Sequence, residues 1–174
     1  AIDSFKQVIK IKPEFAEAYY NIGNILKDNG HPDAAIVSYK QALKIKPDYA
    51  NAHYNMGNTL KDKGELEAAI HSYKQAIKIK PDYAAAFNNM GYSLKDQGKL
   101  EEAIANFQQA IKLKPDYAEA YNNMGNTLKD KGEPEAAIES FKRALTVTPD
   151  YAEAYNNMGN ALRDKGDLEA AIES

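Results

Sequence analysis

Asparagines recur at two positions inside segments that have the periodicity of helices. The first asparagine row repeats every 34 residues and comprises Asn21, Asn55, Asn89, Asn123 and Asn157. The second asparagine row, three residues further along each copy, comprises Asn24, Asn58, Tyr92, Asn126 and Asn160. A side-chain amide has one acceptor and two donors, so it matches the C=O and N–H groups of a peptide. These rows predict hydrogen bonding to the backbone of a bound polypeptide.

A second pair of rows carries alternating charge and is predicted to lie beside the asparagine rows. It comprises Lys27, Asp28, Lys61, Asp62, Lys95, Asp96, Lys129, Asp130, Arg163 and Asp164. A cation followed directly by an acid forms either a self-neutralising solvated face or ion pairs between repeats. Each such exposed pair contributes little to stability.

The residues of catalysis and metal binding are sparse. His31, His53 and His71 are the three histidines, and they form no i, i+4 pair of the kind that holds a metal on a helix. The serines lack a positioned base, and cysteine is absent. We therefore expect no enzymatic activity, no metal and no cofactor, although the chain could be a targeting module of a larger enzyme.

Composition narrows the choice of partner and compartment. The formal net charge is −3, whereas surfaces that bind nucleic acid usually show a basic excess. No apolar run reaches the roughly 18 residues that cross a bilayer, and the first residues do not resemble a secretory signal. We expect no nucleic-acid or membrane partner. The compartment is undetermined, with the cytoplasm favoured over secretion.

The 34-residue period predicts one uninterrupted array over residues 1–174. Four complete repeats span residues 16–49, 50–83, 84–117 and 118–151. Residues 1–15 form the second helix of an earlier partial repeat, and residues 152–174 form a later partial repeat.

Each repeat is predicted to contain two helices. In residues 118–151 the first helix carries Tyr121, Met124, Gly125 and Leu128 on one face, and the second carries Ala137, Phe141 and Ala144. Gly132 separates them as a left-handed residue, Pro134 suits the first turn of the second helix, and Pro149 follows its end. Asp116 with Glu119, and Asp150 with Glu153, have the spacing of a capping box. The helical glycines should allow close approach opposite the alanines of the second helix.

This pattern resembles the tetratricopeptide repeat family. The matching letters are Y-x-x-M-G-x-x-L at 121–128, A-x-x-x-F at 137–141, and Pro149. The resemblance covers the whole chain and implies an all-α, right-handed superhelical solenoid of stacked antiparallel helix pairs. It also implies that first helices line a concave groove that binds proteins or peptides. The rows further resemble the asparagine ladder of the O-GlcNAc transferase superhelix.

The ladder hypothesis rests on spacing. First helices stacked about 10 Å apart would meet an extended peptide at about every third residue, since a strand rises about 3.3 Å per residue. Two alternatives remain open: the asparagines were copied by duplication, or they bond to neighbouring helices as structural supports. A carboxylate clamp for chaperone tails is disfavoured, because the residues before the first row are Tyr20, Tyr54, Asn88, Asn122 and Asn156, with no cation. Single-stranded RNA binding is a remote alternative.

The ends of the sequence lie partway through repeats. Solenoids need polar capping helices for solubility, and neither end shows one. We expect a fragment of a longer array whose apolar ends associate head to tail. A self-assembling structural scaffold is thus the main alternative function.

Overall fold

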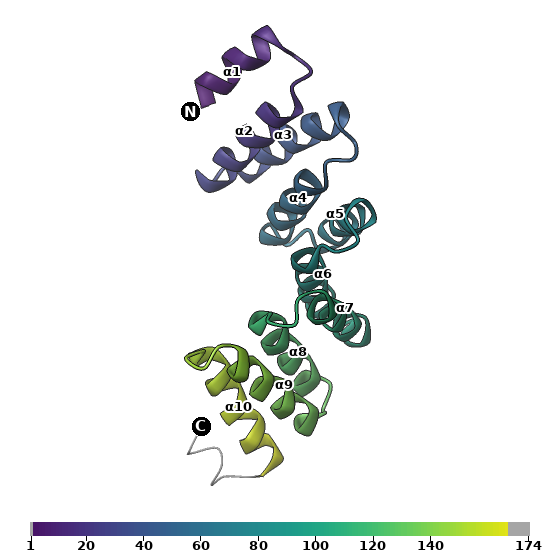
Figure 1. Cartoon of the computed structure of the whole chain (residues 1–174), viewed down its shortest axis with the longest axis vertical. Coiled ribbons are helices and arrows are strands. Elements are labelled where there is room, and N and C mark those ends of the chain that lie inside the picture. Colours follow the sequence, from purple (N-terminus) through teal and green to yellow (C-terminus); the bar gives the residue numbers. More distant parts are fainter. Residues whose placement is uncertain (1, 167–174) are drawn as a thin grey trace. The chain divides into compact units, whose positions relative to one another are not determined.

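The computed structural model describes residues 2–166, and every regular element in that range is an α-helix (Figure 1). The first five helices are α1 (Ile2–Ile11), α2 (Ala16–Asp28), α3 (Pro32–Ile45), α4 (Ala50–Asp62) and α5 (Leu66–Ile79). The next five are α6 (Ala84–Asp96), α7 (Leu100–Leu113), α8 (Ala118–Asp130), α9 (Pro134–Val147) and α10 (Ala152–Lys165). Within the described range, no helix combines the length and apolar character that crossing a bilayer requires. The predicted partial repeat 152–174 extends beyond the described residues.

The chain divides into two compact units, residues 1–86 and residues 87–174, and the division falls inside α6. In the N-terminal unit, α1 packs on α2, α2 on α3, α3 on α4 and α4 on α5. In the C-terminal unit, α7 packs on α8, α8 on α9 and α9 on α10. Consecutive helices pair in both units, which confirms the all-α fold of stacked helix pairs.

The contact that closes each hairpin joins a glycine to an aromatic ring. Phe141 of α9 is fully buried, and its Cε1 would lie 2.6 Å from a Cβ placed on Gly125 of α8. Tyr39 on Gly23, Tyr73 on Gly57 and Phe107 on Gly91 repeat this arrangement, with closest distances of 2.5, 2.7 and 2.8 Å. The sequence predicted close approach at these glycines, but what approaches is the aromatic ring rather than the alanine. Burying such a ring is worth roughly 1.5–3 kcal/mol.

The core around Phe141 draws on neighbouring repeats. Its buried members include Leu128 of α8, Ile138 of α9 and Ala161 of α10. Ile104 of α7 and Met158 of α10 pack against it as partly buried side chains. A hairpin therefore shares its interior with the helices before and after it, as stacked repeats require.

The helix ends follow the glycine and proline signals but not the predicted capping box. Gly132 has φ +85°, a left-handed conformation that ends α8 without a Cβ penalty, and Pro134 lies in the first turn of α9. The capping-box prediction is wrong at α8, whose N-cap is Tyr117 and makes no side-chain cap hydrogen bond. The helix begins two residues after Asp116, so that side chain lies in the turn. Glu119 instead accepts a hydrogen bond from another repeat.

One aromatic position on the first helices holds a histidine. His53 of α4 is half-buried, and its Nε2 lies 3.1 Å from the Pro47 carbonyl oxygen. Its Nδ1 is buried and has no hydrogen-bond partner among the described residues. Burial lowers the pKa of His53, the Pro47 carbonyl raises it, and the charge of His71 lowers it again. The fold thus favours the neutral ring.

We expect Gly125→Ala to destabilise the protein by about 1 kcal/mol. Overpacking a dense core costs roughly 1–3 kcal/mol, which outweighs the gain of up to about 1 kcal/mol in helix propensity. Urea unfolding followed by circular dichroism measures the change. In a Phe141→Leu background the ring is gone, so adding Gly125→Ala should cost nothing or stabilise. An equal loss in both backgrounds would contradict the assignment of the clash.

We expect His53 to make stability fall as the pH drops. Its folded pKa lies below its unfolded value of about 6.5, so the unfolded chain takes up the proton first. The contribution is complete above about pH 6.5 and is lost progressively below it. Denaturation at pH 7.5 and 5.5 measures the loss. His53→Phe, which copies Phe87, should reduce it, whereas His31→Asn in an exposed loop should not.

Candidate functional site: the asparagine rows of the first helices

Both asparagine rows lie on the first helices α2, α4, α6, α8 and α10. The members Asn21, Asn24, Asn55, Asn58, Asn89, Asn123, Asn126, Asn157 and Asn160 are all half-buried, whereas Tyr92 is 39% exposed. Amide groups at such positions either reach solvent or bond within the protein. The structure shows that several do both.

In the N-terminal unit, Asn55 of α4 bonds back to α2. Its Nδ2 donates to the Tyr20 hydroxyl and to Asn24 Oδ1, each at 2.9 Å. Asn24 Oδ1 also accepts from the Tyr39 hydroxyl at 2.9 Å. Burial is the main reason that the pKa of Tyr39 is raised, so this phenol remains a donor. The two rows are therefore joined from one repeat to the previous one.

In the C-terminal unit, buried asparagines replace the tyrosines as partners of the first row. Asn123 Nδ2 donates to Asn88 Oδ1 at 3.1 Å, and Asn157 Nδ2 donates to Asn122 Oδ1 at 3.0 Å. Asn88 and Asn122 are 1% and 0% exposed. In the sequence, these positions are distinguished only by the lack of a cation, and neither their burial nor their hydrogen bonds were predicted.

The same buried amides bond forward to a carboxylate of the next repeat. Asn88 Nδ2 donates to Glu119 Oε1 at 3.1 Å and to Asn89 Oδ1 at 3.2 Å. Asn122 Nδ2 donates to Glu153 Oε1 at 3.0 Å. Each buried asparagine thus accepts from one residue of the first helix of the next repeat and donates to another residue of that same helix. Both of its amide atoms are satisfied, as a buried polar group requires.

The tyrosines and the buried asparagines occupy equivalent positions but build different surroundings. In the N-terminal unit, the ring centroid of Tyr20 lies 4.9 Å from that of Tyr49, and Tyr54 lies 4.8 Å from Tyr83. Burial and the neighbouring tyrosines raise the pKa of Tyr83 to about 12. In the C-terminal unit, burial raises the pKa of Tyr151, and the Glu153 and Glu119 carboxylates raise it further. Tilted tyrosine pairs therefore surround this position in the first unit, and carboxylates surround it in the second.

The internal hydrogen bonds orient the amides of the first row. Among the described residues, Nδ2 of Asn55, Asn123 and Asn157 donates to the previous repeat, and the Oδ1 atoms of these three asparagines accept no hydrogen bond. These three oxygens are not among the buried atoms that lack a partner, so each of them reaches solvent. Asn24 is held the other way round: its Oδ1 is used and its Nδ2 is not. Asn55, Asn123 and Asn157 of the first row therefore offer acceptors to solvent, whereas Asn89 Oδ1 accepts from Asn88. Asn24 of the second row offers a donor.

The partner of the second row depends on the ring of the second helix. Asn58 Oδ1 accepts from the Tyr73 hydroxyl at 2.8 Å, as Asn24 does from Tyr39. The later second helices carry Phe107 and Phe141, which have no hydroxyl. Where phenylalanine is present, the row holds Tyr92 and Asn126, and Asn126 makes no side-chain hydrogen bond within the described range. The change from tyrosine to phenylalanine after the second complete repeat was the available sequence signal for this difference.

The charged rows form some ion pairs between repeats. Lys27 Nζ lies 3.9 Å from Asp62 Oδ2, and Lys95 Nζ lies 3.4 Å from Asp130 Oδ2. Lys61 Nζ lies 3.8 Å from Asp62 Oδ1 on its own helix. These partly exposed pairs are worth about 0–1 kcal/mol each. Asp28, Asp96, Arg163 and Asp164 are exposed.

Within the described range, no set of acidic or histidine side chains could hold a metal ion.

A family model described as "TPR repeat" matches residues 1–30, 23–64, 57–98, 91–132 and 125–162, and a second, "Tetratricopeptide repeat", matches residues 152–174. The chain is a tetratricopeptide repeat protein. The resemblance drawn from the sequence is thereby confirmed over the whole chain.

Solved structures of other tetratricopeptide repeat proteins share the fold. A structure of MamA is 30% identical, with a TM-score of 0.85 over 92% of this chain and 88% of that chain. YrrB, whose structure is described as "a TPR protein with an unusual peptide-binding site", is 25% identical, with a TM-score of 0.82 over 99% and 89%. MamA from Desulfovibrio magneticus RS-1 is 22% identical, with a TM-score of 0.84 over 91% and 89%, which shows the fold alone. A comparison with curated proteins found no match.

We expect Asn122→Ala to destabilise this tetratricopeptide repeat protein by about 1–3 kcal/mol. The change leaves the amide of Asn157 and the carboxylate of Glu153 without their partner. Denaturant unfolding and amide hydrogen exchange of α8 and α10 measure the effect. Asn156→Ala is the matched control, because the equivalent Asn156 is exposed and should change stability by less than about 0.5 kcal/mol. Equal effects of the two substitutions would contradict a polar relay between repeats, that is, the pair of hydrogen bonds by which Asn122 joins Asn157 and Glu153.

Proposed function

We propose that this tetratricopeptide repeat protein is a non-catalytic interaction module that holds an extended peptide along its first helices. The contacts are assigned to the two asparagine rows, with Tyr92 as an aromatic member and the charged rows at the border. The observation that carries the proposal is the orientation of Asn55, Asn123 and Asn157, each of which turns Oδ1 toward solvent. That YrrB is described as having a peptide-binding site supports it.

The orientation predicts what the peptide must present. A row of carbonyl oxygens accepts from backbone N–H groups, whereas Asn24 Nδ2 donates to a backbone C=O. Both contacts are made to atoms that every residue except proline shares. Binding therefore depends weakly on side chains and strongly on free N–H groups. Each net hydrogen bond is worth about 1 kcal/mol, so a few of them support only about millimolar affinity, and micromolar affinity needs roughly eight.

The structural role of the asparagines does not compete with this proposal. The hydrogen bond through Nδ2 fixes the side chain on its rotamer, and the loss of side-chain entropy on binding is reduced accordingly. A pre-oriented acceptor is worth more to a ligand than a freely rotating one. The support between repeats and the contact to peptide use different atoms of the same amide.

We expect a defined library of synthetic dodecamer peptides to contain binders that lose affinity when their backbone is methylated. N-methylation at alternate residues removes N–H donors and leaves the side chains and the protein unchanged. Affinity measured by fluorescence anisotropy should fall at least tenfold. The same peptides methylated on the alternate residues that face solvent serve as the control. Equal affinity of methylated and unmethylated peptides would contradict the proposal.

The variant Asn55→Ala/Asn123→Ala/Asn157→Ala tests the protein side. Loss of three net hydrogen bonds predicts a fall in affinity of up to about 100-fold. Melting curves must accompany this variant, because the substitutions also remove supports between repeats. Asn156→Ala is again the control. Unchanged peptide capture by the folded triple variant would remove the ladder hypothesis.

A further inference from the structure

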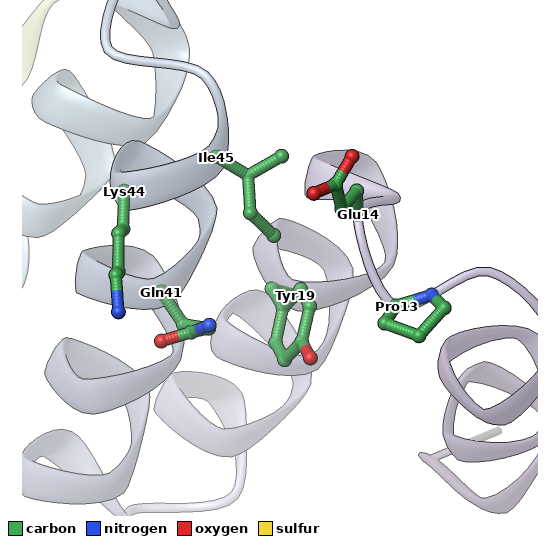
Figure 2. Close-up of a pocket in the computed structure, with 6 residues that line it drawn as sticks. All are labelled: Pro13, Glu14, Tyr19, Gln41, Lys44 and Ile45. Carbon is green, nitrogen blue, oxygen red and sulfur yellow. The ribbon is translucent and has the colours of Figure 1, made fainter.

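A pocket of about 430 Å³ lies in the N-terminal unit on residues that the asparagine rows do not include. It is lined by Pro13 and Glu14 of the turn before α2, Tyr19 of α2, and Gln41, Lys44 and Ile45 of α3 (Figure 2). Tyr19, Gln41 and Ile45 are half-buried, whereas Pro13, Glu14 and Lys44 are exposed. The pocket is therefore a depression whose half-buried lining is Tyr19, Ile45 and the amide of Gln41, with the charged Glu14 and Lys44 on its exposed rim.

The polar side chains of this pocket have no partners within the described residues. Glu14, Tyr19, Gln41 and Lys44 take part in no side-chain hydrogen bond or ion pair. In Figure 2 the Tyr19 ring lies between Lys44 and Gln41 on one side and Glu14 on the other. A cation and an acid thus flank an aromatic ring without pairing with each other. By contrast, Lys46, which directly follows α3, pairs with Glu17 of α2, with its Nζ 3.4 Å from Glu17 Oε1.

The next repeat provides an internal comparison. Its equivalent residues are Pro47, Asp48, His53, Gln75, Lys78 and Ile79. His53 replaces Tyr19, and its Nε2 lies 3.1 Å from the Pro47 carbonyl oxygen. That ring is held against the backbone of the turn, whereas the Tyr19 hydroxyl makes no such bond. Lys78 therefore matches Lys44 in sequence without facing an equivalent tyrosine.

We propose that this pocket binds a peptide segment that places an apolar, preferably aromatic, side chain on Tyr19, with an acidic residue toward Lys44 and a basic residue toward Glu14. Charge complementarity selects the flanking residues. In an extended segment, residues i, i+2 and i+4 point to the same side, so the pattern is acidic-x-aromatic-x-basic. This is a side-chain-specific site, unlike the backbone-directed asparagine rows.

An open depression suits a peptide better than a small molecule. Pockets for small molecules bury most of the ligand surface, whereas half of these lining residues are exposed. The aromatic floor supplies stacking, and the two charges fix the direction of the segment. Because the ion pairs remain at the surface, salt should weaken binding.

The test uses the pentapeptide acetyl-Asp-Ser-Phe-Ser-Lys-amide and amide chemical-shift mapping of the whole chain. We expect shifts at residues 13–19 and 41–45 and an affinity at least tenfold higher than for acetyl-Asn-Ser-Phe-Ser-Gln-amide or acetyl-Asp-Ser-Ala-Ser-Lys-amide. Lys44→Glu should reduce the affinity at least tenfold, and a probe with Lys in place of Asp should regain it. Lys78→Glu is the matched control and should leave binding unchanged. Both substitutions are at exposed residues.

Four results would overturn the inference. They are the absence of shifts in the pocket, equal losses for Lys44→Glu and Lys78→Glu, equal binding of free phenylalanine, and a concentration-dependent dimer that Lys44→Glu dissolves. The last two would assign the pocket to a small molecule or to a second copy of this chain. The Asn55→Ala/Asn123→Ala/Asn157→Ala variant should retain the pentapeptide, so failure here is separate from failure of the asparagine rows.

Discussion

The packing of an aromatic ring directly on a helical glycine is the constraint on which each hairpin depends. Tyr39, Tyr73, Phe107 and Phe141 are each fully buried, and a Cβ on the facing glycine would lie within 2.5–2.8 Å of the ring. The ring fills the space between the two helices, so it sets how closely they approach. Close approach then determines which side chains of the first helix face neighbouring repeats and which face outward.

Stacking turns this local contact into a polar relay between repeats. Asn88 and Asn122 are buried against the first helix of the next repeat, which is α8 for Asn88 and α10 for Asn122. Their burial is tolerated because that helix supplies both an amide donor and a carboxylate acceptor. In the N-terminal unit the Tyr20 hydroxyl accepts from Asn55 Nδ2 at the equivalent position. Two chemistries therefore solve one problem, the satisfaction of a polar position between stacked first helices. The carboxylates of Glu119 and Glu153, which resemble capping residues in the sequence, are used in this relay.

The relay also bears on the proposed peptide contacts. In Asn55, Asn123 and Asn157 the amide is held through Nδ2, while Oδ1 accepts no hydrogen bond from the described residues; the proposed peptide contacts rest on this orientation. The pocket at Tyr19 differs from these rows, because its charged side chains have no partner among the described residues and an aromatic ring lies between them. The two proposed surfaces, one backbone-directed and one side-chain-directed, use residues only two positions apart, Asn21 and Tyr19, because residues two positions apart on a helix point about 200° apart.

Much of the fold was predictable from the sequence, because it depends on local rules. The 34-residue period, the left-handed Gly132, Pro134 in the first turn and the paired helices each follow from residue type and spacing. The single-array organisation and the peptide contacts remain predictions. Tertiary structure alone decided the direction of the amides, the burial of Asn88 and Asn122, the fate of Glu119 and the pocket beside Tyr19. Each of these depends on which atoms of residues some 30 positions away come within hydrogen-bond distance. A periodic sequence shows that such residues stack, but which of its two amide atoms an asparagine turns inward is set by the partner it meets there.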